Sequence, residues 1–234
     1  MHAPMKFAII AAGDGSRLKS EGAPLPKPLV PIGGEPMVGR LVKLMRRCGA
    51  DKVSIIVNPA DRLTVGYLET LPEVRLVLKA TPSSMHSLYE LRPFLEGGRC
   101  CVTTVDTIFR EDEFADYLQR LETCSADCLM GVTAFVDDEK PLYVEVDDKM
   151  GINGFYDSEC GCRYVSGGIY GLNDRALQTL QRCVEGGQSR MRSFQRQLVT
   201  DGLKLEAFAF GKIVDVDHLS DVEEAERLIY NRQL

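Results

Sequence analysis

With 234 residues, the chain is long enough for one α/β domain that buries roughly 70% of its unfolded surface. Its apolar fraction of 44% and its charged fraction of 26% are those of an ordinary globular protein. The net charge of −6 argues against a nucleic-acid partner, because nucleic-acid binding needs a clustered basic face. An acidic enzyme that handles nucleotides usually recruits Mg²⁺ to offset charge repulsion, so the composition favours a metal-assisted site for small molecules.

The apolar run near the N-terminus, about seven residues long, continues directly into a glycine-rich loop and does not fit a secretory signal. No later stretch reaches the roughly 18 apolar residues of a membrane span. The spacings of the eight cysteines match neither the usual zinc pairs nor a disulfide framework, so reduced thiols in a packed interior are expected. We therefore expect a cytoplasmic protein that does not bind membranes.

The glycine-rich loop follows a short buried strand predicted over residues 7–10. Gly13 and Gly15 allow a tight turn that presents several backbone N–H groups to one anion. Arg17 adds a planar fork of donors suited to phosphate oxygens, and Lys27 adds a point charge for a second phosphoryl group. This combination predicts a phosphate-binding site. The nucleotide-binding residues expected in the loop are Ala11, Ala12, Gly13, Asp14, Gly15 and Ser16.

Residues 11–18 and 26–29 together resemble the signature of the sugar-phosphate nucleotidyltransferases, also called NDP-sugar pyrophosphorylases. That family's loop reads roughly A-A-G-x-G-[ST]-R-[LM] and is followed by P-K-P-L. A dinucleotide-binding loop would need a third glycine where Leu18 stands, and the Gly-Lys-Ser/Thr of a P-loop is missing. The resemblance implies catalytic roles for Lys27 at the α-phosphate of a nucleoside triphosphate and for Arg17 at the β- and γ-phosphates.

Helices and strands alternate in the next part of the chain. Pro36 opens an amphipathic helix that stops at Gly49, and strands are predicted over 53–57 and 74–78 with a weaker helix over 61–70 between them. This alternation implies parallel βαβ units with right-handed crossovers. The apolar face of the first helix consists of Val38, Leu41, Val42 and Met45.

The segment 81–88 precedes another helix, and Ser83 or Ser84 is expected to cap it. Free N–H groups at such a helix start can bind an anion. In the resembled family this position carries the loop that meets the nucleobase and ribose, which implies nucleotide contacts from Ser84 and Ser87. Helix capping alone is the open alternative.

Two aspartates follow predicted strands: Asp106 after 99–105, and Asp217 after 213–216. Ligand-binding groups collect at the carboxyl ends of parallel strands. The sequence around Asp106 resembles the family's G-D-x-x-F, and the sequence around Asp217 resembles its D-I-D-T-P-E-D-L ending. The resemblance implies that both carboxylates bind Mg²⁺, a hard cation that prefers oxygen ligands. A capping or turn role remains the alternative for Asp106, and Asp215 is the alternative to Asp217.

A smaller β-rich substrate lobe is expected around 137–170. Gly167 and Gly168 lie in a strand that resembles the family's G-I-Y strand near the sugar, although a bulge would also explain them. Many family members carry the lysine of an E-K-P motif before this strand, where it holds the sugar phosphate. This chain has no such lysine, and Arg163 is the nearest cation that could replace it.

The remaining elements complete the alternation. Asp147 and Asp148 are expected to form a turn. Ser220 and Glu223 form a capping box for the last helix, and Asp221 complements its dipole. The other predicted helices are 111–122, 174–184 and 190–201, and the other predicted strands are 129–136, 142–147, 152–156 and 205–210.

These features predict a single domain over residues 1–234. The fold class is α/β, a three-layer α/β/α Rossmann-like, GT-A-like nucleotidyltransferase fold with a mostly parallel, mixed sheet. The resemblance implies a Mg²⁺-dependent transfer of a nucleoside monophosphate from an NTP to a phosphorylated acceptor, most readily a sugar 1-phosphate. A phosphocholine cytidylyltransferase, a molybdopterin guanylyltransferase and an inactive nucleotide-binding regulatory protein are the alternatives. The sequence leaves open the base of the NTP, the acceptor and whether the chain forms a homo-oligomer.

Overall fold

The computed structural model describes residues 4–136 and 140–230. Its main sheet contains β1 (Lys6–Ala11), β4 (Val53–Val57), β5 (Val74–Leu78), β6 (Cys100–Thr104), β8 (Cys128–Thr133), β9 (Tyr143–Val146), β10 (Ile152–Tyr156), β11 (Tyr164–Leu172) and β12 (Leu205–Phe210). Two short pairs lie outside it: β2 (Pro31–Ile32) with β3 (Glu35–Pro36), and β7 (Thr107–Ile108) with β13 (Val214–Asp215).

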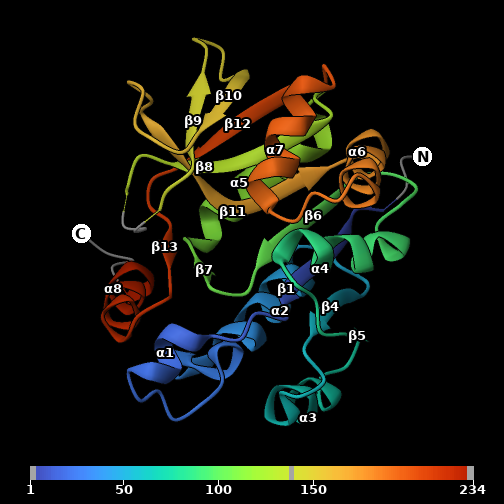
Figure 1. Cartoon of the computed structure of the whole chain (residues 1–234). Helices are drawn as coiled ribbons and strands as arrows, with labels where there is room; N and C mark the ends of the chain where they lie inside the picture. Colours follow the sequence, from blue (N-terminus) through green and yellow to red (C-terminus); the bar gives the residue numbers. More distant parts are fainter. Residues whose placement is uncertain (1–3, 137–139, 231–234) are drawn as a thin grey trace.

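The strand order is β10-β9-β11-β6-β1-β4-β5, and β8 and β12 continue the sheet on the other edge of β11. Strand β1 runs parallel to both of its neighbours, β4 and β6, whereas β11 runs antiparallel to β6 and β8. The mostly parallel, mixed sheet predicted from the sequence is therefore confirmed (Figure 1).

The helices are α1 (Ser16–Ser20), α2 (Met37–Arg47), α3 (Arg62–Glu69), α4 (Ser84–Leu91), α5 (Glu111–Thr123), α6 (Asp174–Glu185), α7 (Met191–Thr200) and α8 (Leu219–Tyr230). Single 3₁₀ turns occur at Lys27–Leu29 and Arg92–Phe94. None of the helices within the described residues is long and apolar enough to cross a membrane.

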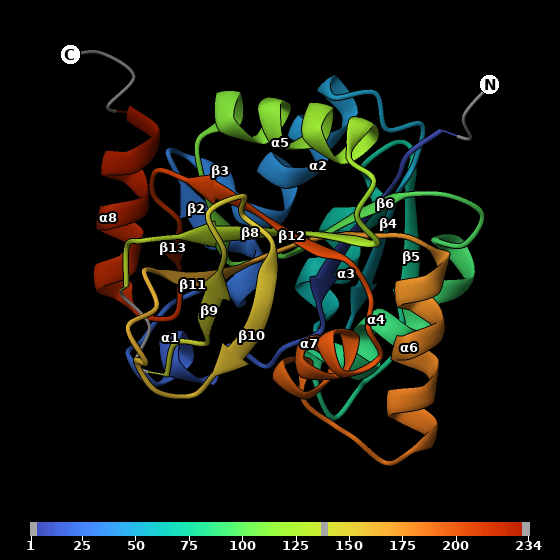
Figure 2. The ribbon, with the colours of Figure 1, turned by 90° about the horizontal axis from the view of Figure 1, so that it is seen from above.

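Helices cover both faces of the sheet, because successive strand residues point to opposite sides. In β1, Ile9 packs into the core beneath α2 and α5, whereas Ile10 packs into the core beneath α4, α6 and α7. Figure 2 shows these two helical layers above and below the sheet seen edge-on. The predicted three-layer α/β/α arrangement is confirmed.

A third core joins the two ends of the chain. Leu18 of α1, Ile108 of β7 and Val214 of β13 are buried together with Ala225 of α8. The pairing of β7 with β13 brings the C-terminal segment back beside the N-terminal glycine loop, and α8 and α1 lie on the same side of the molecule (Figure 1). The buried contacts at this junction therefore fix the position of the segment that precedes α8.

The predicted hairpin of the β-rich lobe is present as β9 and β10, which pair antiparallel. It is continuous with the main sheet, because β9 pairs with the first residues of β11. Asp147 forms the turn as predicted, since its Oδ1 accepts hydrogen bonds from the N–H groups of Lys149 and Gly151. The start of the predicted lobe, residues 137–139, lies outside the described residues.

One strand prediction in this region is modified, and the expectation for the cysteines is confirmed. The strand predicted over 129–136 ends at Thr133, because the Thr133 hydroxyl accepts the N–H of Phe135 and turns the chain out of the sheet. The cysteines are free, and the thiols of Cys100, Cys101, Cys124, Cys128 and Cys183 are buried, as expected for small apolar side chains.

Candidate active site

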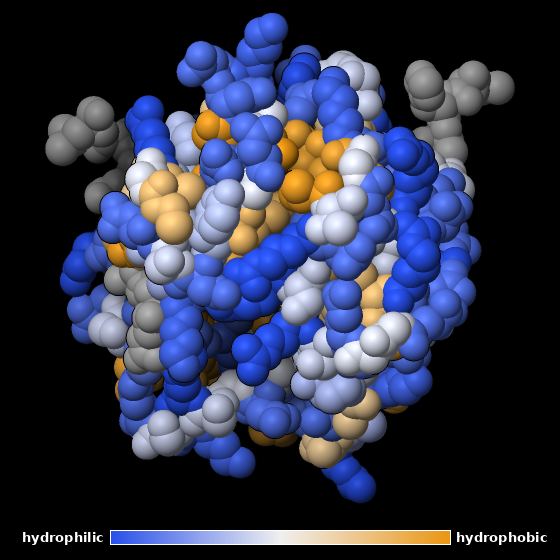
Figure 3. Space-filling view, turned by 45° about the horizontal axis from the view of Figure 1, so that its top comes forward, coloured by the Kyte–Doolittle hydropathy of each residue, from blue (hydrophilic) through white to orange (hydrophobic). Residues whose placement is uncertain are grey.

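A cleft of about 420 Å³ opens at the carboxyl ends of β1 and β6. Hydrophilic side chains surround a hollow near the middle of the face shown in Figure 3. The cleft brings together most of the residues predicted to bind the nucleotide or metal: Ala12, Gly13, Asp14, Gly15, Ser16, Arg17, Lys27, Ser84, Ser87, Asp106 and Asp217. Ala11 does not line it, because this residue ends β1 beneath the cleft and is buried in the core.

Gly15 shapes the loop for a steric reason. It lies in the left-handed region with φ of 56°, and it immediately precedes α1. A Cβ at this position would lie 2.7 Å from Cβ of Lys27, so only glycine allows the lysine to cross the loop. Gly13 differs, because a Cβ there would meet no protein atom within 4 Å. Gly13 therefore leaves space at the cleft rather than fitting a packed neighbour.

Lys27 lies between the two predicted metal ligands. Its Nζ is 2.5 Å from Oδ2 of Asp106 and 2.6 Å from Oδ1 of Asp217, and only 9% of the side chain is exposed. Burial alone would lower the pKa of Lys27, but the charges of Asp106 and Asp215 and the two hydrogen bonds raise it well above its ordinary value. The lysine is therefore a fixed positive charge at physiological pH.

The carboxylate of Asp106 is less fully hydrogen-bonded than the ammonium group of Lys27. Burial would raise the pKa of its carboxyl, but the charge and hydrogen bond of Lys27 outweigh burial and lower it, so the group is ionised. Its Oδ1 atom is buried and has no hydrogen-bond partner in the described structure. A buried carboxylate oxygen without a donor is costly, and a cation or a ligand donor would satisfy it.

The carboxylates fit a hard divalent cation that is shared with a substrate. The described residues contain no cluster of three or more His, Cys, Asp or Glu side chains that could hold a metal ion. Asp106 and Asp217 would therefore supply only part of a coordination shell. Mg²⁺ commonly binds one or two carboxylates and completes its shell with water and substrate phosphates, so these residues fit that ion.

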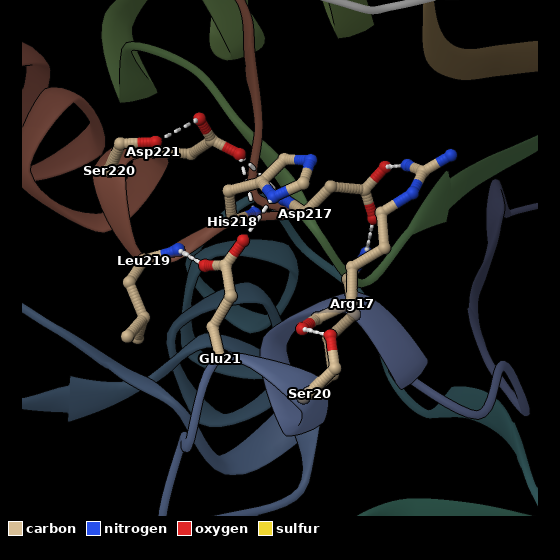
Figure 4. Close-up of polar contacts among 9 residues, drawn as sticks. Arg17, Ser20, Glu21, Asp217, His218, Leu219, Ser220 and Asp221 are labelled. Carbon is tan, nitrogen blue, oxygen red and sulfur yellow. Dashed lines mark hydrogen bonds and ion pairs between the residues drawn. The ribbon is translucent and has the colours of Figure 1, made fainter.

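Arg17 projects from α1 and contacts Oδ2 of Asp217 (Figure 4). The guanidinium side chain is 43% exposed, so one side of it faces the open part of the cleft. Asp217 is thus shared by two cations from the N-terminal part of the chain. Such a carboxylate is held in place even though 29% of its side chain is exposed.

The start of α4 forms another wall of the cleft. Ser83 caps the helix, because its hydroxyl accepts the N–H of His86, which confirms the capping prediction. Ser84 begins the helix, and the buried hydroxyl of Ser87 lies 2.6 Å from the hydroxyl of Thr81. Both predicted serines therefore line the cleft, with Ser87 deeper in the protein.

The two predicted substrate glycines form a bulge in β11. The register against β8 shifts between Ser166 and Ile169, which leaves Gly167 and Gly168 unpaired. Gly168 has φ of 74°, and a Cβ on it would lie 2.5 Å from the hydroxyl oxygen of Thr107. Local packing therefore explains these glycines, which was the alternative interpretation of the sequence. They also line a small cavity of about 60 Å³ together with Thr107, Thr133, Phe135, Val165, Ser166, Ile213 and Asp215.

Arg163 lines neither the cleft nor the small cavity. Its guanidinium lies over the ring of Tyr164, 5.3 Å from the centroid. The structure therefore does not bring it to the place where a replacement for the E-K-P lysine would be needed.

Two polar residues of these cavities were missed in the sequence. Thr104 ends β6 and lines the cleft, and its hydroxyl lies 2.6 Å from that of Thr107, which lines the small cavity. Both flank Asp106, so the same strand-end rule that selected Asp106 could have found them. Asp215, the alternative to Asp217, lies in the small cavity instead of the cleft.

The capping box predicted for the last helix is wrong. Helix α8 begins at Leu219, so Ser220 is already inside it. The N–H groups of Asp217 and His218 donate to Asp221, whose role therefore goes beyond complementing the dipole. Glu21, from the distant end of α1, accepts the N–H of Leu219 (Figure 4).

Comparison with known proteins agrees with this geometry. Residues 7–200 match the family model described as the MobA-like NTP transferase domain. The bifunctional protein GlmU of Methanococcus maripaludis is 23% identical over 235 residues, which cover 97% of this chain and 55% of that protein. The GlmU of Kineococcus radiotolerans is 23% identical over 221 residues, covering 90% and 44%. The chain thus spans about half the length of these relatives.

Two solved structures share the fold. The inositol-1-phosphate CTP transferase from T. maritima has a TM-score of 0.79 and 19% identity, with each chain covered over 100% of its length. A putative glucose-1-phosphate thymidylyltransferase from Bacillus anthracis, in complex with a sucrose, has a TM-score of 0.84 and 18% identity, and the match covers 99% of this chain and 97% of that one. At these identities the likeness shows the fold, which is the predicted nucleotidyltransferase fold.

Proposed function

Because the chain belongs to the MobA-like NTP transferase domain family, we propose that it is an active, Mg²⁺-dependent nucleotidyltransferase whose acceptor is a sugar 1-phosphate. The observation that carries this proposal is the position of Lys27, whose ammonium group joins Asp106 to Asp217 beside the glycine loop. An inactive nucleotide-binding protein would be free to lose these charges, and all of them are present.

The reaction forms a bond between a phosphate oxygen of the acceptor and the α-phosphorus of the NTP, and it breaks the bond from the α-phosphorus to the leaving pyrophosphate. The attacking phosphate is already ionised, so positioning and charge neutralisation matter more than a general base. Lys27 and Arg17 both line the cleft, and the raised pKa of Lys27 keeps it charged; we assign Lys27 to the α-phosphate and Arg17 to the β- and γ-phosphates. A Mg²⁺ held by Asp106 and Asp217 would neutralise charge on the phosphates.

The N–H groups of the glycine loop add a preorganised anion site. Gly15 turns the chain into α1, and Gly13 leaves its part of the cleft open for a ligand. Such N–H groups at the start of a short helix cost little reorganisation when charge develops, so they stabilise the transition state. The start of α4 at Ser84 is placed on the opposite wall of the same cleft and is expected to face the nucleoside.

The names of the two structural neighbours support a phosphorylated polyol as the acceptor, since both proteins are named for such substrates. The hydroxyls of Thr107, Thr133 and Ser166 line the small cavity with Asp215, and its volume of about 60 Å³ can take one or two hydroxyl groups of an acceptor but not a whole sugar. Hydroxyl and carboxylate groups are suited to recognise sugar hydroxyls. The cavity suits phosphocholine less, because Lys212 already lies over the one aromatic ring there, 3.8 Å from its centroid.

We also propose a cytoplasmic location, because eight free cysteines are typical of a reducing compartment. The protein would then act where NTPs and sugar phosphates are available.

Pyrophosphate release tests the proposal directly. The four NTPs and dTTP would be assayed with Mg²⁺ against sugar 1-phosphates, inositol 1-phosphate and phosphocholine. We expect release that requires a phosphorylated polyol and is lost in Asp106→Asn. Release that depends on phosphocholine alone would overturn the acceptor assignment. Binding of an NTP without release from any pair would overturn the enzymatic proposal.

A further inference from the structure

The carboxylate of Glu21 ties the end of α1 to the start of α8 (Figure 4). Its Oε2 accepts the N–H of Leu219 at 2.8 Å, and its Oε1 lies 2.5 Å from Nδ1 of His218. Glu21 immediately follows α1, the helix that begins after the glycine loop and carries Arg17. A side chain on the phosphate-binding element therefore holds a segment almost two hundred residues away in sequence.

The held segment is the one that positions Asp217. On its other side, Oδ2 of Asp221 accepts the N–H groups of Asp217 at 2.9 Å and of His218 at 2.7 Å. The backbone of this segment is thus fixed by two carboxylates, one from α8 itself and one from α1. From this backbone the side chain of Asp217 reaches Lys27 at 2.6 Å and also contacts Arg17.

The carboxylates of Asp221 and Glu21 fix this segment in different ways. Asp221 shapes the segment locally, because it belongs to the first turn of α8 and moves with that helix. Glu21 sets where the start of α8 lies relative to α1, and so it sets the distance from Asp217 to the cations of the loop. The contact is on the rim of the site, since the side chains of Glu21 and His218 are 36% and 32% exposed. An exposed pair of this kind contributes little to global stability, so its main effect is on position.

We infer that Glu21 is a positioning residue that holds Asp217 in place against Lys27. It does not touch the reacting groups itself, and it acts through the imidazole of His218 and the backbone N–H of Leu219. The kinetic part of its test rests on the proposed nucleotidyltransferase activity, whereas the structural part does not.

The chain offers a matched control in Glu226, a carboxylate on α8 that accepts a backbone N–H from the N-terminal part of the chain. Its Oε1 accepts the N–H of Gly33 at 3.1 Å, away from Asp217. Glu21→Ala and Glu226→Ala therefore each remove one carboxylate tie between α8 and the N-terminal region. Glu21→Gln keeps an oxygen that can accept the N–H of Leu219, so it serves as the conservative variant.

The first readout is amide hydrogen exchange of the protein without substrate, followed by mass spectrometry. We expect Glu21→Ala to accelerate exchange in the peptide that spans Asp217 to Leu219 by about tenfold, because a local tie is lost, while Glu226→Ala leaves that peptide unchanged. Glu21→Gln should restore most of the protection. Equal exchange of this peptide in wild type and Glu21→Ala would overturn the inference.

The second readout is the steady-state kinetics of pyrophosphate release. Glu21→Ala should lower kcat on the order of tenfold, because Asp217 is misplaced, and should leave the KM of the acceptor within about twofold. Glu226→Ala should stay within about twofold of wild type in kcat. Equal losses in the two variants would contradict a positioning role. If wild type releases no pyrophosphate, the proposed function fails while the exchange experiment still decides the inference.

Discussion

Two aspartates with largely covered side chains lie at opposite ends of the same sheet, and their surroundings differ: the side chain of Asp106 is 20% exposed and that of Asp127 is 9% exposed. Asp106 follows β6 at the carboxyl end of the parallel strands, where the cleft lies. Asp127 precedes β8 at the other end. Both have a lowered pKa, because hydrogen bonds and a nearby cation outweigh the burial that would raise it. Charge and burial alone therefore do not tell the two residues apart.

The difference lies in how completely each carboxylate is hydrogen-bonded. Asp127 accepts from Asn173 at 3.0 Å, from Arg175 at 2.9 Å and from the N–H of Lys204 at 2.9 Å, so both of its oxygens are satisfied. Asp106 has Oδ2 against Lys27, while Oδ1 is buried with no hydrogen-bond partner in the described structure. The carboxylate of Asp127 is fully hydrogen-bonded and stabilises the fold, whereas Oδ1 of Asp106 can accept from a ligand donor or bind a cation at the cleft.

The largest effect is expected from Lys27→Ala, which breaks the link between the incomplete carboxylate and Asp217. We expect kcat to fall about 10²-fold or more, because a preorganised charge is lost and Asp106 is left without its cation. Pyrophosphate release would be measured beside Lys79→Ala, which removes an exposed lysine paired with Glu90. A kcat for Lys27→Ala within threefold of the control would contradict a role in catalysis.

Alanine substitutions at Gly13 and Gly15 should distinguish a glycine that leaves space for a ligand from a glycine that packing requires. Gly15→Ala places a side chain at positive φ and against Lys27, so we expect it to destabilise the protein by about 1 kcal/mol or more and to lower activity. Gly13→Ala meets no protein atom, so its melting temperature should match wild type while the KM for the NTP rises about tenfold. The two variants would be compared by thermal unfolding and by NTP kinetics. Equal losses of stability would show that this distinction is wrong.

Asp127→Asn should destabilise the protein by about 2 kcal/mol at neutral pH, because an amide N–H₂ replaces an acceptor that faces Arg175 and the N–H of Lys204. The folded pKa of Asp127 is lowered, so its stabilising effect is present above the unfolded pKa of about 3.9 and is lost as pH falls through the folded value. The difference in free energy of unfolding between Asp127→Asn and wild type, measured with urea, should therefore become smaller below about pH 4. Its kcat should stay within about twofold of wild type, and a large loss of kcat at full stability would contradict a structural role.

The smallest effect is expected from Ser166→Ala, in the small cavity whose hydroxyls are proposed to contact the acceptor. Gln195 is buried, and its amide N–H donates to the Ser166 hydroxyl at 2.9 Å; the same hydroxyl is also hydrogen-bonded to Tyr170. Ser166→Ala should raise the KM of the acceptor about fivefold and leave the KM of the NTP unchanged, as expected for the loss of one neutral hydrogen bond. A change in the KM of the NTP alone would show that this cavity contacts the nucleotide and not the acceptor.

Local patterns selected the glycine loop and Asp106, and the structure brings them together at one cleft. The glycine loop is continuous in sequence, and Asp106 could be selected from the end of one buried strand. The β-rich side depended on tertiary structure that no local pattern encodes. The strands of β7 and β13 are two residues long, and their pairing with each other is what places Asp217 in the cleft.

Two sequence-based choices depended on structure that local spacing does not encode. Arg163 was selected for its proximity in sequence, and it lines neither the cleft nor the small cavity. The capping box at Ser220 had the right spacing, but α8 begins one residue earlier, and the N–H of Leu219 donates to Glu21, which lies far away in the sequence.

The most direct test is to assay Asp106→Asn and Asp127→Asn side by side for pyrophosphate release and for free energy of unfolding. We predict that Asp106→Asn loses about 10²-fold in kcat while its free energy of unfolding stays within about 1 kcal/mol of wild type. Asp127→Asn should show the reverse, with near-normal kcat and lower stability. If Asp106→Asn retains full activity, or if both variants lose activity only in proportion to stability, the incomplete carboxylate is not the centre of a catalytic site.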